Sequence, residues 1–204
     1  MLHEQMCMLH RGGGLRQHRF GFKSNAAAAA QLYTKPHIFE AELGDDAVAR
    51  LAPQLAATLE SLRLPESASA AFPSLRLLGE GGVSVKLQCN DGEGCFPLHY
   101  DNAGPPSRRR LTALFYLNPS WREGDGGELQ LLPWLEAPLT VAPLHGRLVL
   151  FLSDTLLHRV LPNHARRYCF TIWMDADGTN GPTSLQVDTS PSPKPRLAAG
   201  GHQP

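Results

Sequence analysis

Several features that would place a protein in a common functional class are missing from this sequence. Its 204 residues carry no net charge, because 19 Lys and Arg balance 19 Asp and Glu. The basic excess of a typical nucleic-acid-binding protein is therefore absent, and we expect no nucleic acid as partner. No apolar run approaches the ~18 residues that a membrane-spanning helix needs, so we expect no membrane partner either.

The cysteines are few and lack a metal-binding spacing. None of the four belongs to a CxxC pair, which argues against a structural zinc site. A disulfide between Cys89 and Cys95 would fit a hairpin, but free thiols in a reducing compartment are the simpler interpretation. We therefore expect the protein in the cytoplasm or the nucleus.

Both ends of the chain have the composition of tails. Residues 1–31 are basic, poor in acids and contain five consecutive alanines. They lack the apolar segment of a secretory signal, so we expect a disordered tail or, alternatively, an organelle-targeting segment. Residues 178–204 are rich in Pro, Ser and Gly, which predicts a second disordered tail. One domain over residues 32–177 remains between them.

An amphipathic segment opens this domain. Between Asp45 and Leu62 the apolar residues recur every three or four positions, which is the spacing of one helix face. Pro53 is unfavourable inside a helix and is expected to begin a second half. We expect one or two helices here that support the back of a sheet.

After Pro73 the sequence changes to short apolar runs separated by turns. The turns are rich in Gly, Pro, Asn and Asp, as in Gly79-Glu80-Gly81-Gly82. Many short strands between such turns indicate an all-β sandwich or barrel. An immunoglobulin-like sandwich, a jelly roll and a lipocalin-like barrel all fit the pattern. The runs are 75–78, 83–88, 111–117, 129–132, 139–142, 147–152 and 168–174.

His99-Tyr100-Asp101 follows one of the predicted strands and has the spacing of a metal site. Residues i and i+2 of a strand point to the same side, so His99 and Asp101 can face one ion while Tyr100 faces away. A third ligand from a distant strand would complete a triad of two imidazoles and one carboxylate. Such a triad leaves positions open on Fe(II), as oxygen chemistry requires.

Three later histidines compete for the third position. His145 lies in a Leu-His-Gly turn and His164 in a Pro-Asn-His loop, so both are expected at the surface. His158 follows an apolar strand and precedes Arg167 by nine positions. We therefore favour His158.

Arg167 opens the apolar run Tyr168-Cys-Phe-Thr-Ile-Trp-Met174. Strand alternation places Arg167, Cys169, Thr171 and Trp173 on one face of this strand. An arginine between apolar neighbours needs an anion, because an unpaired buried charge is costly. Its guanidinium can grip a carboxylate with two hydrogen bonds, and Thr171 can add a third.

Four motifs follow one another between about Leu75 and Asp177. They are His99-Tyr-Asp-Asn, Arg110-Leu-Thr-Ala-Leu-Phe-Tyr-Leu-Asn, Gly124-Asp-Gly-Gly-Glu-Leu and His158-Arg-Val-Leu-Pro-Asn-His-Ala-Arg-Arg-Tyr-Cys-Phe-Thr-Ile-Trp. In this order they closely resemble the prolyl 4-hydroxylase-like 2-oxoglutarate oxygenases, nearest to the oxygen-sensing prolyl hydroxylase branch.

The resemblance implies a mainly β fold, a double-stranded β-helix (jelly roll) with supporting N-terminal helices. It implies Fe(II) on His99, Asp101 and His158, and 2-oxoglutarate whose far carboxylate meets Arg167 and Tyr116. The family's reaction consumes O2, converts 2-oxoglutarate to succinate and CO2, and hydroxylates a substrate C–H bond, commonly with L-ascorbate keeping the iron ferrous. A prolyl residue of a protein or peptide is the expected substrate.

One departure from the family pattern concerns Cys89. The oxygen-sensing branch has a tyrosine ten residues before its first iron ligand, where this chain has Cys89, so we expect an active-site contact to be missing. Two other functions stay open from the sequence. They are a dioxygenase acting on a non-prolyl substrate and a cupin-like protein that binds metal without turnover.

Overall fold

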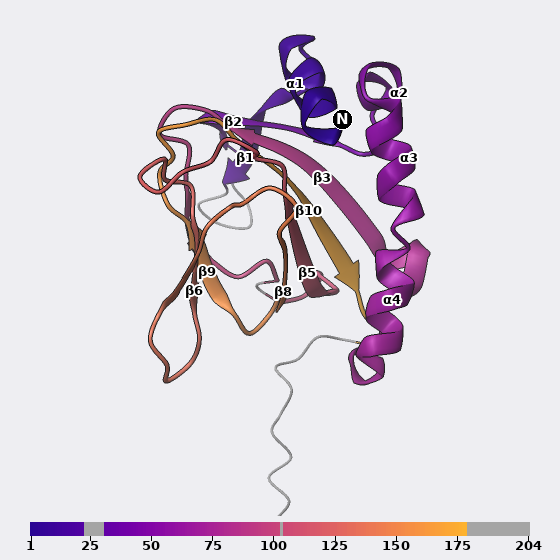
Figure 1. The fold of residues 1–204 in the computed structure, drawn as a ribbon. Coiled ribbons are helices and arrows are strands. Elements are labelled where there is room, and N and C mark those ends of the chain that lie inside the picture. The colour runs from indigo at the N-terminus through magenta and orange to yellow at the C-terminus, as the bar shows by residue number, and fades with distance from the viewer. Residues whose placement is uncertain (23–30, 103, 179–204) are drawn as a thin grey trace, which may run out of the picture.

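The computed structural model describes residues 1–22, 31–102 and 104–178. Two antiparallel sheets form the body of this part of the chain, and helices lie along one side (Figure 1). The larger sheet has six strands in the order β1-β2-β3-β10-β5-β8, and the smaller has four in the order β4-β9-β6-β7.

The larger sheet contains β1 (Arg16–Phe22), β2 (Gln31–Glu42), β3 (Val83–Asn90), β5 (Arg109–Tyr116), β8 (Leu148–Leu152) and β10 (Arg167–Asp175). The smaller contains β4 (Phe96–His99), β6 (Leu129–Leu132), β7 (Leu139–Val141) and β9 (Leu157–Val160). From β3 onward the chain alternates between the two sheets, except at the β6–β7 hairpin. This winding is that of a jelly roll and confirms the predicted mainly β fold.

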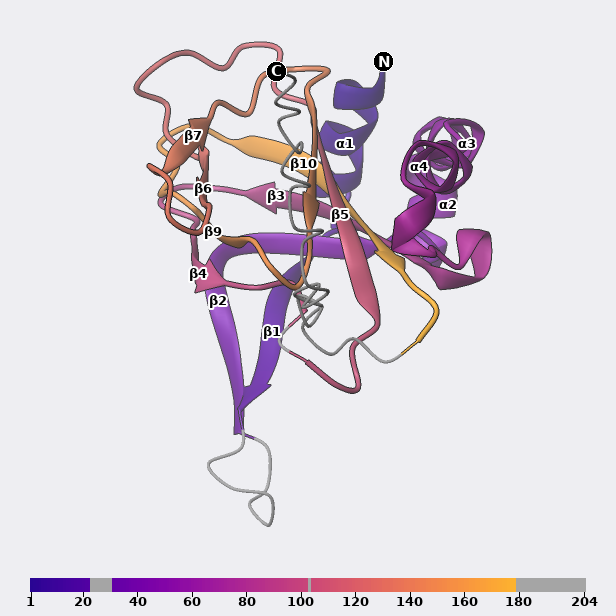
Figure 2. The same cartoon turned by 90° about the horizontal axis from the view of Figure 1, so that it is seen from below.

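The two sheets face each other and share a small core. Leu114 and Tyr116 of β5 pack with Leu129 and Leu131 of β6 and with Val160 of β9. Figure 2 shows the smaller sheet lying across one face of the larger one. A pocket between the sheets can therefore draw side chains from both of them.

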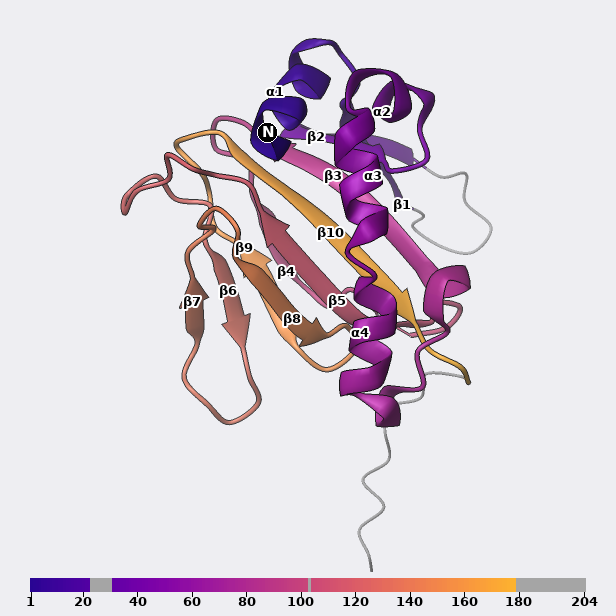
Figure 3. The same ribbon diagram turned by 45° about the vertical axis from the view of Figure 1, so that its right-hand side comes forward.

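The predicted helical segment is confirmed, including its division at Pro53. α2 (Asp46–Leu51) ends before the proline, and α3 (Pro53–Ser61) begins on it, where its missing N–H costs nothing. α4 (Leu64–Ala71) continues the row (Figure 3). These helices bury Val48, Leu55 and Leu59 in a core with the outer face of the larger sheet.

The expected tail over residues 1–31 is corrected in its described part. Residues Leu2–Arg11 form α1, whose Met6 and Leu9 are 0% exposed, and β1 follows directly. The basic composition of the segment concealed the apolar pair, which is spaced for one face of a helix. Residues 23–30 and 179–204, which include nearly all of the second expected tail, lie outside the described residues.

The predicted strand over 75–78 is wrong. Pro73–Leu75 and Gly79–Gly82 form short 3₁₀ turns, and Leu77 makes only an isolated bridge to Ala176. The left-handed backbone of Arg76 and Gly79, with φ of 52° and 68°, interrupts any extended run. All four cysteines are free. In the described ranges we find no helix that is long and apolar enough to span a membrane.

Candidate functional site

His99, Asp101 and His158 come together between the two sheets. Each offers one ligand atom, and these atoms lie within 4.8 Å of one another. His99 on β4 pairs directly with His158 on β9, and Asp101 follows β4 by two residues. Asp101 lies 3.6 Å from the Nε2 of His99 through one carboxylate oxygen and 3.7 Å from that of His158 through the other.

Backbone carbonyls fix the orientation of both imidazoles. The Nδ1 of His99 lies 2.8 Å from the carbonyl of Pro97, and that of His158 lies 3.0 Å from the carbonyl of Leu156. An Nδ1–H that donates to a carbonyl leaves the Nε2 lone pair free. Both lone pairs then face Asp101, which is the arrangement a divalent metal requires.

A hydrogen bond from the larger sheet fixes the carboxylate of Asp101. The hydroxyl of Thr112 on β5 donates to its Oδ2 at 2.7 Å, and Ser153 contacts the same hydroxyl at 2.8 Å. Thr112 faces Trp173 across the β5–β10 ladder. The three residues His99, Asp101 and His158, called the metal-type cluster below, therefore lie toward the C-terminal end of β10.

The electrostatics of the cluster favour a cation. Burial disfavours the Asp101 carboxylate, but the neighbouring His99 and His158 imidazoles and the hydrogen bond from Thr112 outweigh it and lower the pKa of Asp101. Burial also opposes protonation of His99, yet its contacts with Asp101 and Pro97 raise the pKa of His99. Burial dominates at His158 and lowers its pKa. An ionised carboxylate beside a neutral imidazole suits metal binding.

Arg167 begins β10 and lies in the same pocket as the cluster. The pocket is lined from both sheets, by Gln88, Phe96, His99, Asp101, Leu114, Leu129, Phe151, His158, Val160, Arg167, Cys169, Thr171 and Trp173. This list contains the four residues that alternation predicts on one face of β10. Their neighbours Tyr168, Phe170, Ile172 and Met174 lie in the core under the helices, so the predicted alternation is confirmed.

The guanidinium of Arg167 has donors without acceptors. The residue is 2% exposed, its Nη1 donates to the Sγ of Cys169 at 3.2 Å, and its Nε and Nη2 have no hydrogen-bond partner in the described structure. The buried hydroxyl of Tyr116 also has none, and burial raises the pKa of this phenol. Native structures rarely leave such donors unpaired, so the arrangement indicates an anionic ligand.

Thr171 lies beside these donors, but its hydroxyl is already used. It donates to the side-chain oxygen of Gln88 at 3.0 Å. Gln88 comes from β3, which pairs with β10. The carboxamide of Gln88 thus adds a polar group to the anion end of the pocket.

The comparison with known proteins gives the family. Residues 85–175 match the model of the 2OG-Fe(II) oxygenase superfamily. This range of the chain has the sequence of that superfamily. The matched range starts in β3 and ends with β10, so it contains the whole pocket and both of its polar ends.

Three solved structures of prolyl hydroxylases are similar to this chain. Prolyl 4-hydroxylase from Phytophthora capsici is 42% identical, with 88% of this chain and 55% of that chain covered and a TM-score of 0.71. A Trichoplax adhaerens prolyl hydroxylase, in complex with a hypoxia inducible factor peptide fragment, is 25% identical, with 84% and 75% covered and a TM-score of 0.59. A Pseudomonas putida prolyl-4-hydroxylase shares the fold at 23% identity, 86% and 84% coverage and a TM-score of 0.64. The chain thus spans little more than half of the first relative.

The superfamily implies Fe(II), 2-oxoglutarate and O2, and the side chains present fit the first two. Two imidazoles and a carboxylate form the donor set of a non-haem Fe(II) site. The unpaired Nε and Nη2 of Arg167 and the hydroxyl of Tyr116 fit the far carboxylate of 2-oxoglutarate.

The competing histidines lie elsewhere. His164 is exposed in a loop, with its Nδ1 2.9 Å from Glu93, and His145 is exposed in a turn. Neither residue belongs to the metal-type cluster.

Cys89 does not line the pocket. Its side chain points away from the pocket into the core under α1, 3.5 Å from His10. Burial raises the pKa of the Cys89 thiol to about 12, so it stays protonated. Gln88, which the sequence did not single out, is the pocket residue of this strand. Cys89 therefore adds no contact to this pocket.

The mouth of the pocket carries a second feature that sequence reasoning missed. The guanidinium of Arg109 lies 3.9 Å from the centre of the Trp173 ring. Trp173 lines the pocket, so the stacked pair forms part of its entrance. Arg109 belongs to the run Arg108-Arg109-Arg110, so this basic run reaches the pocket entrance.

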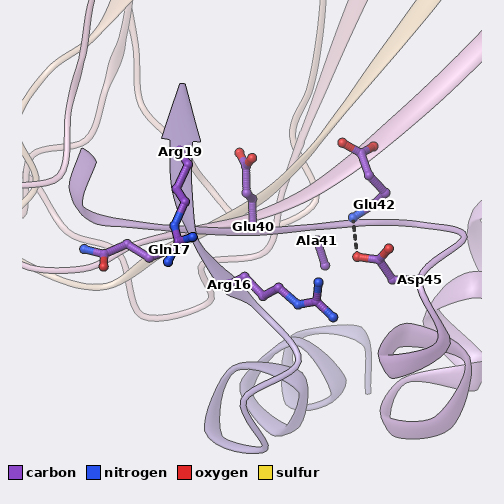
Figure 4. Close-up of a pocket in the computed structure, with 7 residues that line it drawn as sticks. All are labelled: Arg16, Gln17, Arg19, Glu40, Ala41, Glu42 and Asp45. Atoms are coloured by element: carbon purple, nitrogen blue, oxygen red, sulfur yellow. Dashed lines mark hydrogen bonds between the residues drawn. The ribbon is translucent and has the colours of Figure 1, made fainter. Parts of the chain in front are cut away.

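A separate cavity of about 490 Å³ lies beside β1 and β2 (Figure 4). It is lined by Arg16, Gln17, Arg19, Glu40, Ala41, Glu42 and Asp45. Glu40 is already paired with His18 and Lys86, at 2.6 Å and 3.1 Å. The cavity shares no residue with the metal-type cluster and has mixed charge, so we do not assign the chemistry to it.

Proposed function

We propose that this chain is a Fe(II)- and 2-oxoglutarate-dependent dioxygenase that hydroxylates a prolyl residue of a protein or peptide. Succinate and CO2 are the other products. One observation carries the proposal: the pocket that holds the His-Asp-His cluster also holds the guanidinium of Arg167, whose Nε and Nη2 lack acceptors in the described structure. A molecule that chelates a metal at one end and ends in a carboxylate satisfies both, and 2-oxoglutarate has this form.

The functional residues form two groups, one near each end of β10. His99, Asp101 and His158 hold Fe(II), which when bound supplies the activation of O2. Arg167 and Tyr116 hold the far carboxylate of 2-oxoglutarate. Thr171 adds a third hydrogen bond when its hydroxyl turns from Gln88, to which it donates in the ligand-free chain, to the carboxylate. L-ascorbate serves to keep the iron reduced.

The pocket walls exclude water from the reacting centre. Phe151 lies 4.6 Å from His158 between ring centres, and Leu114 and Leu129 complete an apolar wall. Burial of the Asp101 side chain strengthens its attraction for the metal. It also keeps water from competing with a substrate C–H bond for the oxidant.

A protein or peptide substrate fits the entrance. Beyond Asp101 an open hollow of about 580 Å³ is lined by Ser84, Gly104, Pro106, Ser107, Arg108, Arg109 and Asp175. The Arg109–Trp173 stack borders it and offers a flat face to a pyrrolidine ring. The similarity to prolyl hydroxylases, one of them with a bound peptide, supports the same substrate class.

The test measures succinate formed from 2-oxoglutarate by purified protein with Fe(II), ascorbate and air, alongside the Asp101→Ala variant. Prolyl peptides are then added, and mass spectrometry locates any added oxygen. Succinate from the native chain alone, with oxygen on proline, is the expected result. Oxygen on another residue or molecule would replace the prolyl assignment. Iron and 2-oxoglutarate binding without succinate under any condition would identify a cupin-like metal-binding protein.

A further inference from the structure

We propose that the chain's own C-terminal segment is a substrate of its site. The segment Ser190–Arg196 reads Ser-Pro-Ser-Pro-Lys-Pro-Arg and offers Pro191, Pro193 and Pro195. It is hydroxylated in cis, by the site of the same molecule. The inference rests on the proposed prolyl hydroxylation and adds one specific substrate to it.

The described chain ends beside the mouth of the pocket. Asp175, the last residue of β10, lines the same hollow as Asp101 and Arg109. Asp101 lines the metal pocket as well, so the two hollows meet at this residue. The C-terminal segment therefore starts next to the metal ligands.

Hydrogen bonds fix this starting point on the rim. The amide of Ala176 donates to the carbonyl of Arg108 at 3.0 Å, and the guanidinium of Arg108 donates back to the carbonyl of Ala176 at 3.1 Å. The amide of Asp177 donates to the carbonyl of Arg76 at 2.9 Å, and its carboxylate pairs with the guanidinium of Arg76 at 3.0 Å. The described chain is thus fixed to the rim as far as Asp177.

The tether has the length to return to the site. Pro191 follows Asp175 by 16 positions, and an extended chain covers about 3.3 Å per residue, or on the order of 50 Å here. A short tether of this kind holds its end at an effective concentration on the order of 1 mM. The tail prolines are therefore presented to the site at a concentration that a free peptide rarely reaches.

The entrance offers a surface that suits proline. The Trp173 ring, backed by the guanidinium of Arg109 at 3.9 Å, forms a flat wall next to the metal cluster. A pyrrolidine ring can lie against such a face without losing a backbone N–H bond, because proline has none. Each tail proline meets this requirement.

The reaction balances with the co-substrates of the proposed function. One proline C–H bond becomes C–OH, a two-electron oxidation, and the C1–C2 bond of 2-oxoglutarate breaks to give CO2 and succinate, also a two-electron oxidation. O2 accepts all four electrons. One of its oxygen atoms enters the new hydroxyl group and the other enters the new carboxylate of succinate.

The first experiment incubates the full chain with Fe(II), 2-oxoglutarate, ascorbate and air without added peptide. Mass spectrometry of the C-terminal proteolytic fragment is expected to show one or more added oxygens on Pro191, Pro193 or Pro195. In the variant in which these three prolines are alanine, succinate formed without added peptide should fall several-fold. Its rate with an added prolyl peptide should equal that of the native chain under saturation.

The second experiment separates cis from trans. Isotope-labelled Asp101→Ala chain, whose own site is inactive, is mixed with unlabelled native chain. Oxygen on the unlabelled tail alone, at a rate per molecule that does not change on dilution, is the expected result. Oxygen on both tails, or a rate that falls with dilution, would overturn the cis assignment.

Failure of the inference is distinguishable from failure of the proposed function. An unmodified tail in a sample that hydroxylates an added prolyl peptide would overturn the inference and leave the function standing. Absence of succinate, of oxygen on the tail and of oxygen on any prolyl peptide would overturn both.

Discussion

The nine residues of β10 alternate between two faces that have opposite roles. On the outer face Phe170 stacks on Phe115 at 5.3 Å between ring centres, and it is completely buried with Ile172 and Met174. On the inner face Arg167 and Trp173 are buried too, but both keep donor nitrogens without partners. One face stabilises the fold, whereas the other accepts a cost in stability that a ligand removes.

The largest expected effect is the loss of the metal. Asp101→Ala removes the only carboxylate of the cluster and should weaken Fe(II) binding by more than about 100-fold, beyond what the loss of an indirect contact causes. Anaerobic Fe(II) titration measures it, with His164→Ala as the matched control because that histidine is exposed and distant from the cluster. Full iron binding by His158→Ala would show that the ligand assignment is wrong.

The outer face is tested by Phe170→Ala. Removing a completely buried phenyl ring leaves a cavity and should lower the free energy of unfolding by about 3–5 kcal/mol. Urea denaturation followed by circular dichroism measures the change. The fraction that stays folded should bind 2-oxoglutarate with native affinity, because the ring faces away from the pocket. A large loss of affinity in this variant would contradict the division between the two faces.

The inner face should give the reverse result in Arg167→Met. Two charge-assisted hydrogen bonds to the far carboxylate are lost, so the Kd for 2-oxoglutarate should rise at least about 100-fold. The free energy of unfolding of the ligand-free chain should stay level or rise by about 1 kcal/mol, since an unpaired buried charge is replaced by an apolar side chain. Arg166→Met is the control, because Arg166 is exposed and paired with Asp91. Strong destabilisation by Arg167→Met would refute the cost assigned to the inner face.

The smallest expected effect is a pH dependence of Fe(II) affinity at the metal-type cluster, which the inner face of β10 borders. Protons compete with Fe(II) for the His99 imidazole, whose pKa lies above its usual range. Affinity should therefore begin to fall while the pH is still above the ordinary histidine pKa, and then by about tenfold per pH unit. His158 and Asp101, with lowered pKa values, protonate only at lower pH. An Fe(II) affinity that stays constant down to about pH 6 would contradict this order.

The parts of the site that sequence reasoning found depend on local periodicity. A strand repeats every two residues, so His99 with Asp101, and Arg167 with Thr171 and Trp173, could be assigned to one side from spacing alone. The division of the helical segment at Pro53 could likewise be predicted from local sequence. These predictions needed no knowledge of which strands pair.

Other parts of the site depend on how the strands pair, and these could not be predicted from the sequence. Counting ten residues back from His99 gives Cys89, but the connection between β3 and β4 lies inside that interval, so the alternation of one strand cannot be carried into the other. Gln88, not Cys89, occupies the pocket. The unpaired atoms of Arg167 and Tyr116 likewise become visible only when both sheets are in place. Helix α1 was missed because its two buried residues lie in a basic segment.

The place of β10 in the sheet has a consequence for how the protein is made. It is the last strand in the described part of the chain, yet it lies in the interior of the larger sheet, hydrogen-bonded to β3 on one side and β5 on the other. Until it is synthesised, β3 and β5 expose unpaired edges to any other extended chain. The sheet cannot close vectorially from its N-terminus, so the nascent chain is most prone to aggregation just before synthesis reaches the strand that carries Arg167.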